Sequence, residues 1–220
     1  MGTAAGGVAG ASLGLLATRP FAALAQPRTA DIDLGNGFRV LTSGETNVLA
    51  VSASDGVALV DGGSATESAA LLQRVAMLPG GAKVHTLFNT HWHPEQTGSN
   101  EALGKAGATI VAQMNTKNWL STDVTWPWDE STTFEPLPEG ARPNKTTFDG
   151  DRLQAGRKSV EYGYLRHAAH TDGDLYVFFP HANVLAVGDA VTSAGWQSID
   201  WWTGGWIGRA SCRERVSKQV

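Results

Sequence analysis

The chain has 220 residues, of which 42% are hydrophobic and 17% charged, enough for one globular domain with an apolar core. A formal net charge of -4 and the lack of a basic cluster in the central part argue against nucleic acid as a partner. No strongly apolar run approaches the ~20 residues that a helix needs to cross a bilayer, so we expect no membrane span.

The first 25 residues have features of a secretory signal peptide. Residues Ala4 to Leu16 are small and apolar, and Ala23-Leu24-Ala25 fits a small-residue cleavage site. The basic region that normally precedes such a segment is absent, because the first Lys or Arg is Arg19. We therefore expect the native start to lie upstream and the protein to be periplasmic or secreted. The alternative is a flexible, Ala/Gly-rich N-terminus of a cytosolic protein.

The next part of the sequence predicts a strand-rich region that contains one longer helix. Ser64-Ala65-Thr66-Glu67 has the pattern of a capping box and predicts a helix start. Pro79-Gly80-Gly81 predicts the end of that helix. Short apolar runs bounded by turn residues predict strands. These strands are expected at residues 38–42, 47–52, 57–61 and 84–88.

The second half predicts short elements around one irregular segment. Two tryptophans and five prolines and glycines between residues 121 and 144 predict a long ordered loop, and loops of this length are usually functional or disordered. Helices are expected at residues 99–105 and 115–120, and strands at 108–112, 146–148, 159–162, 164–167, 175–179 and 184–187. Strands and helices that alternate in this way favour a layered α/β domain.

Residues Asn89 to Gly98, directly after the strand expected at 84–88, form the most informative motif. On an extended backbone residues i and i+2 point the same way, so His91 and His93 can bind one ion together. Glu95 adds a carboxylate on the same loop. Zinc is the first choice, because imidazole suits it and no cysteine lies nearby. The alternative is that two histidines one residue apart occur by chance in a surface loop.

Three further motifs follow the same order as a known family. They are Asp61-Gly62-Gly63 after an apolar strand, His170-Thr171-Asp172-Gly173-Asp174, and a strand that runs into Asp189. Together with His91 to Gln96, this order resembles the metallo-β-lactamase fold superfamily from about Asp31 to Trp206. One departure is clear, because Glu95-Gln96 stands where that family has Asp-His.

The resemblance implies an α/β fold, a four-layer αββα metallo-β-lactamase-like sandwich. Residues 31–206 are expected to form part of this domain, with the C-terminal part missing. Residues 207–220 resemble a translated sequencing adapter and contain Cys212, the single cysteine. We expect this tail to be non-native; the alternative is a genuine basic tail. Without it the chain has no cysteine, so neither a disulfide framework nor a thiolate zinc site is expected.

The resemblance also implies the metal ligands. His91, His93 and His170 are the expected zinc ligands, and Asp189 is expected to ligate or bridge metal. Asp61 is expected to brace the histidine loop through hydrogen bonds rather than touch the metal. Three imidazoles leave a position of Zn2+ open for water and lower the pKa of that water toward ~7. His85, His167 and His181 are not expected to be ligands.

Glu95 is the expected catalytic residue, because its carboxylate can orient or deprotonate a water. Glu95 and Gln96 also mark a possible second metal site. Gln96 offers only an amide oxygen and weakens that site, so we expect one zinc ion and leave a second in doubt. Trp92, Trp126 and Trp128 could form an apolar wall for the substrate, although aromatic residues in such loops more often only pack.

These features predict a zinc-dependent hydrolase that attacks an ester, thioester or amide (lactam) with metal-bound hydroxide. Its partner would be a small-molecule substrate. The alternative is a non-catalytic member of the same fold that binds a metal or a ligand, which the Glu95-Gln96 pair favours. A redox enzyme using iron would need more carboxylate ligands than the sequence offers.

Overall fold

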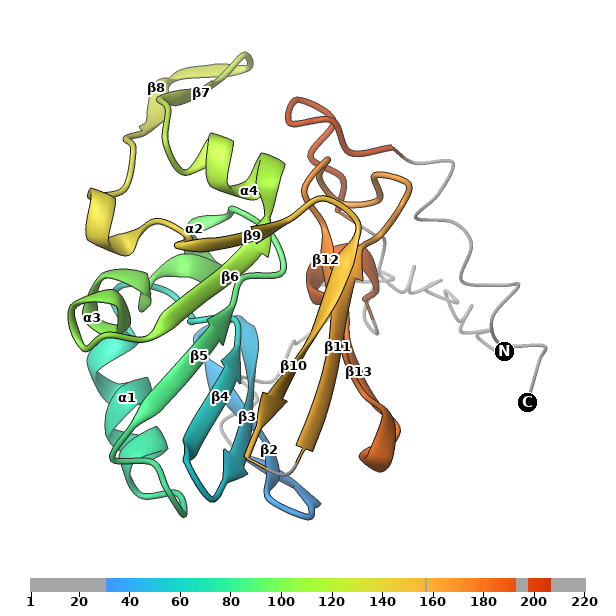
Figure 1. Ribbon diagram of the computed structural model, residues 1–220. Coiled ribbons are helices and arrows are strands. Elements are labelled where there is room, and N and C mark those ends of the chain that lie inside the picture. Colours follow the sequence, from blue (N-terminus) through green and yellow to red (C-terminus); the bar gives the residue numbers. More distant parts are fainter. Residues whose placement is uncertain (1–30, 157, 193–197, 207–220) are drawn as a thin grey trace, which may run out of the picture.

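Two β-sheets face each other in the structure, a computed structural model that describes residues 31–156, 158–192 and 198–206 (Figure 1). The larger sheet has seven strands in the order β1-β2-β3-β4-β5-β6-β9. Its strands β4, β5, β6 and β9 run parallel, so their carboxyl ends share one edge. The strands are β1 (Ile32–Gly35), β2 (Phe38–Ser43), β3 (Thr46–Ala53), β4 (Gly56–Val60), β5 (Val84–Phe88), β6 (Thr109–Gln113) and β9 (Lys145–Thr147).

The second sheet is antiparallel and has four strands in the order β10-β11-β12-β13. A separate two-stranded hairpin, β7–β8, projects beyond the carboxyl edge of the larger sheet (Figure 1). The bounds are β10 (Gly150–Ala155), β11 (Lys158–Tyr164), β12 (Leu175–Phe179), β13 (Val184–Ala186), β7 (Val124–Trp126) and β8 (Asp129–Phe134).

Helices cover the face of the larger sheet that points away from the second sheet (Figure 1). α1 (Ser68–Ala76) and α3 (Asn100–Lys105) lie on this face, whereas α2 (Pro94–Thr97) and α4 (Met114–Trp119) follow strands at the carboxyl edge. Within the described ranges, none of the helices is long and apolar enough to cross a bilayer. Three short 3-10 turns complete the described chain: η1 (Glu139–Ala141), η2 (Pro180–Ala182) and η3 (Gly188–Ala190).

Successive side chains of the central strands point to opposite faces of the larger sheet, and this creates two apolar cores. In β3, Leu49 and Val51 point between the two sheets, whereas Val48 and Ala50 point toward the helices. Strand β4 is buried along its whole length, as expected for a strand covered on both faces. The described residues thus build a helix layer and two sheet layers of the expected α/β sandwich; the second helix layer is not found among them.

Several sequence expectations need correction. The capping box is wrong: α1 begins at Ser68, and its N-terminal cap Glu67 makes no side-chain cap hydrogen bond. The segment 121–144 is not a plain loop, because it contains the β7–β8 hairpin and η1. Strands β1 and β10 were not expected, and the two strands expected at 159–162 and 164–167 are the single strand β11. The expected signal peptide and the tail that the sequence predicts to be non-native both lie outside the described residues.

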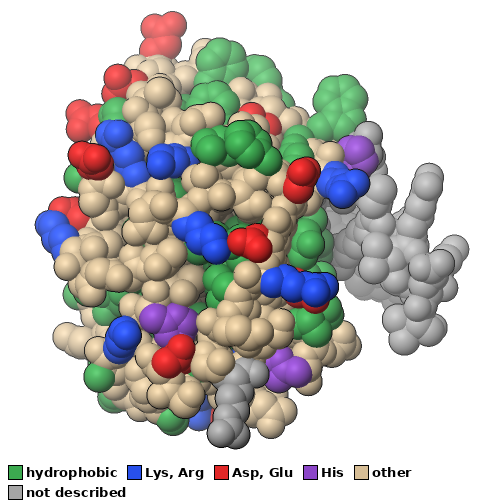
Figure 2. Space-filling model, in the orientation of Figure 1, with side chains coloured by type: hydrophobic (Ala, Val, Ile, Leu, Met, Phe, Trp, Pro, Cys, Tyr) green, Lys and Arg blue, Asp and Glu red, His purple; other side chains and the backbone are tan. Residues whose placement is uncertain are grey.

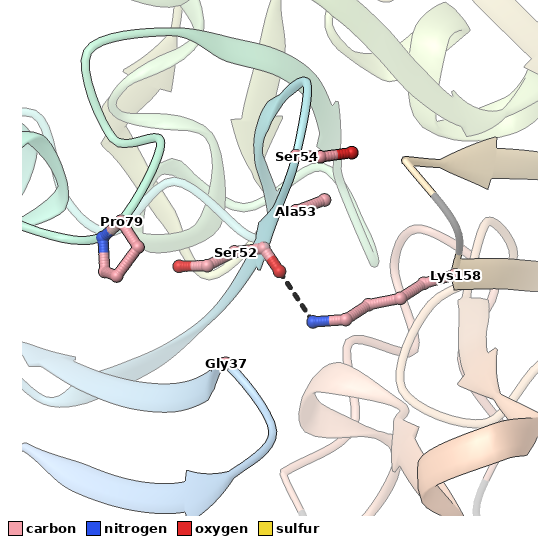
Figure 3. Close-up of a pocket in the computed structure, with 6 residues that line it drawn as sticks. All are labelled: Gly37, Ser52, Ala53, Ser54, Pro79 and Lys158. Carbon is pink, nitrogen blue, oxygen red and sulfur yellow. Dashed lines mark hydrogen bonds between the residues drawn. The ribbon is translucent and has the colours of Figure 1, made fainter.

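Lys158 joins the two sheets at the end opposite to the carboxyl edge. Its ammonium donates hydrogen bonds to the backbone oxygens of Ser52 (2.6 Å) and Asn36 (2.8 Å), and it lies 4.7 Å from the ring centre of Phe38. Figure 3 shows Lys158 reaching toward Ser52 across a pocket beside Pro79. Because its donors serve backbone carbonyls, Lys158 has a structural role here.

Candidate metal centre

Three histidine side chains converge at the carboxyl edge of the larger sheet. The loop after β5 carries His91 and His93, and the loop between β11 and β12 carries His170. All three are buried, and one ring nitrogen of each lies within 4.8 Å of the others. The structure therefore brings together the three residues that the sequence predicted as ligands.

Each histidine uses its remaining ring nitrogen in a hydrogen bond away from the cluster. These bonds join His91 Nδ1 to Thr90 Oγ1 (3.1 Å), His93 Nε2 to Asp200 Oδ2 (3.0 Å) and His170 Nδ1 to the backbone oxygen of Ser198 (2.8 Å). The nitrogens that face one another are thus His91 Nε2, His93 Nδ1 and His170 Nε2. Such outer hydrogen bonds fix the ring orientation of metal-binding histidines.

The donor set fits a metal ion. His91 Nε2 is buried and has no hydrogen-bond partner, and His93 Nδ1 lies 3.1 Å from His170 Nε2. Burial, together with the nearby His170 and His93, holds the pKa of His91 well below its usual value. The ring is therefore neutral and its inward lone pair is free. Three imidazoles are a donor set that suits zinc.

Two carboxylates border the histidine cluster. Asp189 Oδ2 lies 3.8 Å from His91 Nε2 and 3.9 Å from His170 Nε2. Glu95 Oε1 lies 3.9 Å from His93 Nδ1. Both side chains are about half exposed, with 46% of their surface accessible. The pair therefore stands where the buried cluster opens toward solvent.

Asp61 is placed behind the cluster, not in it. Its carboxylate accepts hydrogen bonds from the backbone nitrogen of Thr90 (2.8 Å) and from Thr90 Oγ1 (2.9 and 3.0 Å). Burial, opposed by these hydrogen bonds, raises the pKa of Asp61 to about 8. A cation held by the histidines would oppose this rise. Asp61 thus braces the loop through Thr90, whose hydroxyl contacts His91.

Asp200 also holds the cluster, although its sequence surroundings did not predict this. Besides His93, it accepts hydrogen bonds from Thr203 Oγ1 (2.5 Å) and from the Thr203 backbone nitrogen (3.2 Å). Burial alone would raise the pKa of Asp200, but the hydrogen bonds from His93 and Thr203 hold it below its usual value. No motif surrounds Asp200 in the sequence, so nothing in its spacing indicated this contact.

The turn that carries His170 is fixed from within. The carboxylate of Asp174 accepts hydrogen bonds from the backbone nitrogens of Ala169 (3.1 Å), His170 (2.7 Å) and Thr171 (3.0 Å). Asp174 is itself buried. The His-Thr-Asp-Gly-Asp motif therefore forms a closed turn that holds the His170 backbone.

Gln96 and Trp92 are both buried. Gln96 donates from Nε2 to Asp189 Oδ2 (3.3 Å), and its Oε1 has no hydrogen-bond partner. Trp92 is only 2% exposed, packs with Leu120 and donates from Nε1 to Thr203 Oγ1 (3.0 Å). The indole of Trp92 is therefore part of the core beneath the site and offers no wall to a substrate.

The other two tryptophans that the sequence suggested for the substrate wall, Trp126 and Trp128, lie on the β7–β8 hairpin. Trp126 is partly buried and Trp128 is 53% exposed, with their ring centres 4.9 Å apart.

The remaining histidines stay outside the cluster. His85 is in β5, His181 is in η2 and His167 is exposed in the loop after β11.

Comparison with known proteins identifies the family to which this chain belongs. The family model described as "Metallo-beta-lactamase superfamily" matches residues 41–219. A curated relative, the hydroxyacylglutathione hydrolase of Erythrobacter litoralis (strain HTCC2594), is 24% identical over 110 residues. That match covers 50% of this chain but only 35% of the relative.

Solved structures show the same fold at low identity. A subclass B3 metallo-beta-lactamase of Bradyrhizobium japonicum has a TM-score of 0.58 and 21% identity, covering 70% of this chain and 59% of that one. A metallo-beta-lactamase from Pontibacter korlensis has a TM-score of 0.57 and 20% identity, covering 76% and 74%.

A third structure bears on the departure at Glu95-Gln96. It is a Cronobacter sakazakii metallo-beta-lactamase described by its HARLDQ motif, with a TM-score of 0.57 and 15% identity over 67% of this chain and 58% of that one. That motif and the segment His91 to Gln96 both begin with His and end with Gln. A glutamine at the end of the motif therefore also occurs in a solved protein of this fold.

Proposed function

Because the chain belongs to the metallo-beta-lactamase superfamily, we propose that it is a zinc-dependent hydrolase of small molecules. The observation that carries this proposal is the arrangement of His91, His93 and His170. Their inward nitrogens lie within 4.8 Å of one another, and each outward nitrogen is held by a hydrogen bond. Such a set is built to bind a metal and not to pack a core.

Zn2+ bound by these residues would supply a nucleophilic water at neutral pH and polarise the carbonyl under attack. Asp189 Oδ2 stands close enough to the cluster to complete the ligand set. Glu95 Oε1 stands on the open side, where it can hold a water, take up its proton and return that proton to the leaving group.

One zinc ion per chain is our proposal for the stoichiometry. A second ion would need a further set of donors beside the first. Gln96 stands in that place, and its amide nitrogen is turned toward Asp189 in a hydrogen bond. An amide in this orientation presents a donor to the carboxylate that a second ion would share, so it disfavours a second site.

The substrate class that we propose is an acyl compound: an ester, a thioester or an amide such as a lactam. Two comparisons support it, because the relative is named a hydroxyacylglutathione hydrolase and the similar structures are named metallo-beta-lactamases. The chain spans only about a third of the curated relative and under two thirds of the first solved structures. The signal-like residues 1–25 support export to the periplasm or the medium as part of this proposal.

Metal analysis coupled to hydrolysis tests the proposal. The protein is stripped with a chelator, refilled with zinc and assayed with an aryl ester, a thioester and a lactam. His91→Ala should lose bound zinc and activity together, because it removes one of three imidazoles. His181→Ala, which removes an exposed histidine in η2, should keep both. Hydrolysis that survives in His91→Ala or in the stripped protein would contradict the proposal.

A second candidate function is metal or ligand binding without catalysis. The observation in its favour is the Glu95-Gln96 pair, which departs from the Asp-His of the family pattern. It predicts full zinc content with no turnover of any of the three substrate classes. That result, obtained with protein that unfolds cooperatively, would favour binding over hydrolysis.

A further inference from the structure

Four tryptophans form a connected surface beside the metal centre, and we name it the tryptophan platform. Its exposed members are Trp128 (53%), Trp201 (60%) and Trp202 (45%), with Trp126 partly buried behind them. The ring centres are 4.9 Å apart for Trp126 and Trp128, 5.5 Å for Trp128 and Trp201, and 5.9 Å for Trp201 and Trp202. Exposed apolar patches of this kind commonly mark binding sites.

The platform is joined to the metal centre from two sides. Trp201 directly follows Asp200, which holds His93 at 3.0 Å. From the hairpin, ring contacts run back to the same histidine. They pass from Trp126 to Phe134 (5.7 Å), from Phe134 to Trp92 (5.4 Å) and from Trp92 to His93 (4.6 Å). The platform is therefore connected through both segments to His93, one of the three proposed zinc ligands.

We propose that the tryptophan platform binds an uncharged or cationic aromatic ring of the substrate and so selects aryl acyl compounds. This inference rests on the proposed function and names its substrate class more closely. Aromatic rings pack on indoles in offset-stacked or edge-to-face geometry. The platform offers such faces at varied angles, since neighbouring rings are tilted by 51°, 41° and 83°.

Charge around the hairpin decides the sign of the ligand. Residues 121–138 contain four acids and neither lysine nor arginine: Asp123, Asp129, Glu130 and Glu135. Figure 2 shows hydrophobic and acidic side chains sharing the upper edge of the molecule, in the region of β7 and β8. An anionic ring would be repelled there, whereas a cation over an indole face is attracted.

The same hairpin argues against a sugar as the ligand. A sugar site needs polar groups beside the aromatic ring to bind hydroxyls, and five of the polar side chains of the hairpin are already bound to one another. Asp129 accepts from Ser131 Oγ (2.5 Å) and Thr132 Oγ1 (2.5 Å), and Thr125 Oγ1 pairs with Thr133 Oγ1 (2.9 Å). The apolar faces are therefore the main feature that the platform offers.

Paired substrates test the selectivity. With zinc-loaded protein, kcat/KM is compared for a naphthyl ester, an alkyl ester of equal leaving-group pKa and an anionic sulfonated naphthyl ester. The naphthyl ester should be preferred and the sulfonated one disfavoured. Trp128→Ala and Trp201→Ala should each lower kcat/KM for the naphthyl ester by roughly 3- to 10-fold, as expected for the loss of an aromatic pair, and leave the alkyl ester nearly unchanged.

Trp206→Ala is the matched control, because Trp206 is 64% exposed and makes none of the ring contacts of the platform. It should behave as the unaltered protein. A binding measurement needs no turnover: naphthalene-2-methanol should quench tryptophan fluorescence saturably in the metal-stripped protein, and less in Trp128→Ala. Equal kcat/KM for aryl and alkyl esters, with no quenching, would overturn the inference while leaving the proposed hydrolase intact.

The experiments also distinguish the case in which the platform binds an aromatic ring but the protein hydrolyses no ester. Saturable quenching that depends on Trp128, with no ester hydrolysed, would keep the platform and reject the hydrolase. Sedimentation with phosphatidylcholine vesicles serves as the last arm. If the protein sediments with vesicles, Trp201→Ala abolishes this, and naphthalene-2-methanol does not quench, the platform is a lipid-binding surface and the inference is wrong.

Discussion

Asp200 lies 3.0 Å from Nε2 of His93, although 107 residues separate them in the chain. Thr203 fixes the carboxylate of Asp200 in turn and also accepts the indole hydrogen bond of Trp92. The histidine loop is therefore held by two neighbouring residues of a distant segment. This contact makes Asp200 a positioning residue for the metal centre.

Replacing this carboxylate should weaken zinc binding without unfolding the protein. Asp200→Asn keeps the size of the side chain but removes the charge that orients His93. Zinc affinity should fall by roughly 10- to 100-fold, the usual cost of losing such an outer partner. Competitive titration with a zinc chelator measures it. Asp33→Asn, which changes an exposed acid paired with Arg39, is the control, and an unchanged zinc affinity in Asp200→Asn would show that the contact is not needed.

Glu95→Gln separates catalysis from metal binding. The three histidines remain, so zinc content should stay nearly unchanged. Hydrolysis should fall by about 100-fold or more, because the amide cannot accept a proton, in line with the ~10²–10⁴ contribution of general acid–base groups. Zinc analysis and kcat of the same preparation decide the matter. Unaltered kcat would exclude Glu95 as the proton acceptor.

Restoring the family pattern should create a second metal site. The double substitution Glu95→Asp with Gln96→His replaces an amide by an imidazole beside Asp189, which now accepts the Gln96 hydrogen bond. Bound zinc after dialysis should rise from about one toward two ions per chain. Gln96→Ala removes the amide without adding a ligand and should remain near one. A double variant that also stays near one would show that more than Gln96 limits the site.

Gly98 should not tolerate a side chain. A Cβ at this position would overlap the backbone nitrogen of Ala65 and the backbone carbonyl carbon of Ser64, so the loop that packs on α2 must move. Gly98→Ala should cost about 3 kcal/mol, the upper part of the range for overpacking, and lower Tm by roughly 6–10 °C for a chain of this size. At Gly140 a Cβ meets nothing within 4 Å, so Gly140→Ala should leave Tm unchanged or slightly higher.

Acid should destabilise the fold partly through His85. Burial lowers the pKa of His85, with the charge of Asp55 opposing this and that of Lys83 adding to it. The unfolded chain then binds more protons than the folded one, so stability falls as pH drops from about 6.5 toward the lowered pKa. His85→Gln should show a smaller loss of Tm between about pH 7.5 and about pH 5.5 than the unaltered protein. His167→Gln, at an exposed position, should follow the unaltered protein; equal losses in all three would exclude His85.

The sequence predicted the parts of the site that rest on local pattern. His91 and His93 lie two residues apart on one loop, and a motif marks His170, so the structure could be expected to bring them together. Trp92 lies between the two histidines in the chain, but its ring packs with Leu120 and lies 4.6 Å from the ring of His93. The burial of Trp92 rests on these tertiary contacts, which the sequence pattern did not indicate.

Other parts depend on contacts that no local pattern records. Asp200 sits in Ser-Ile-Asp-Trp-Trp, which has no metal-ligand spacing, and only the tertiary fold shows that it reaches His93. Ser64 and Glu67 match a capping box, yet the hydroxyl of Ser64 pairs with Thr66 and α1 begins one residue after Glu67. Strand β10 is exposed at most positions, so it lacks the apolar run that identified its neighbours.

The long sequence separation of the Asp200–His93 contact also affects when the metal site forms during folding. The centre draws on Thr90, on the His170 turn and on Asp200, so a growing chain presents Thr90 long before Asp200. Contacts this far apart in sequence form late, because the intervening chain must be ordered before they can close. Mature zinc affinity should therefore appear only when the last described segment docks, which makes tight metal capture a marker of completed folding.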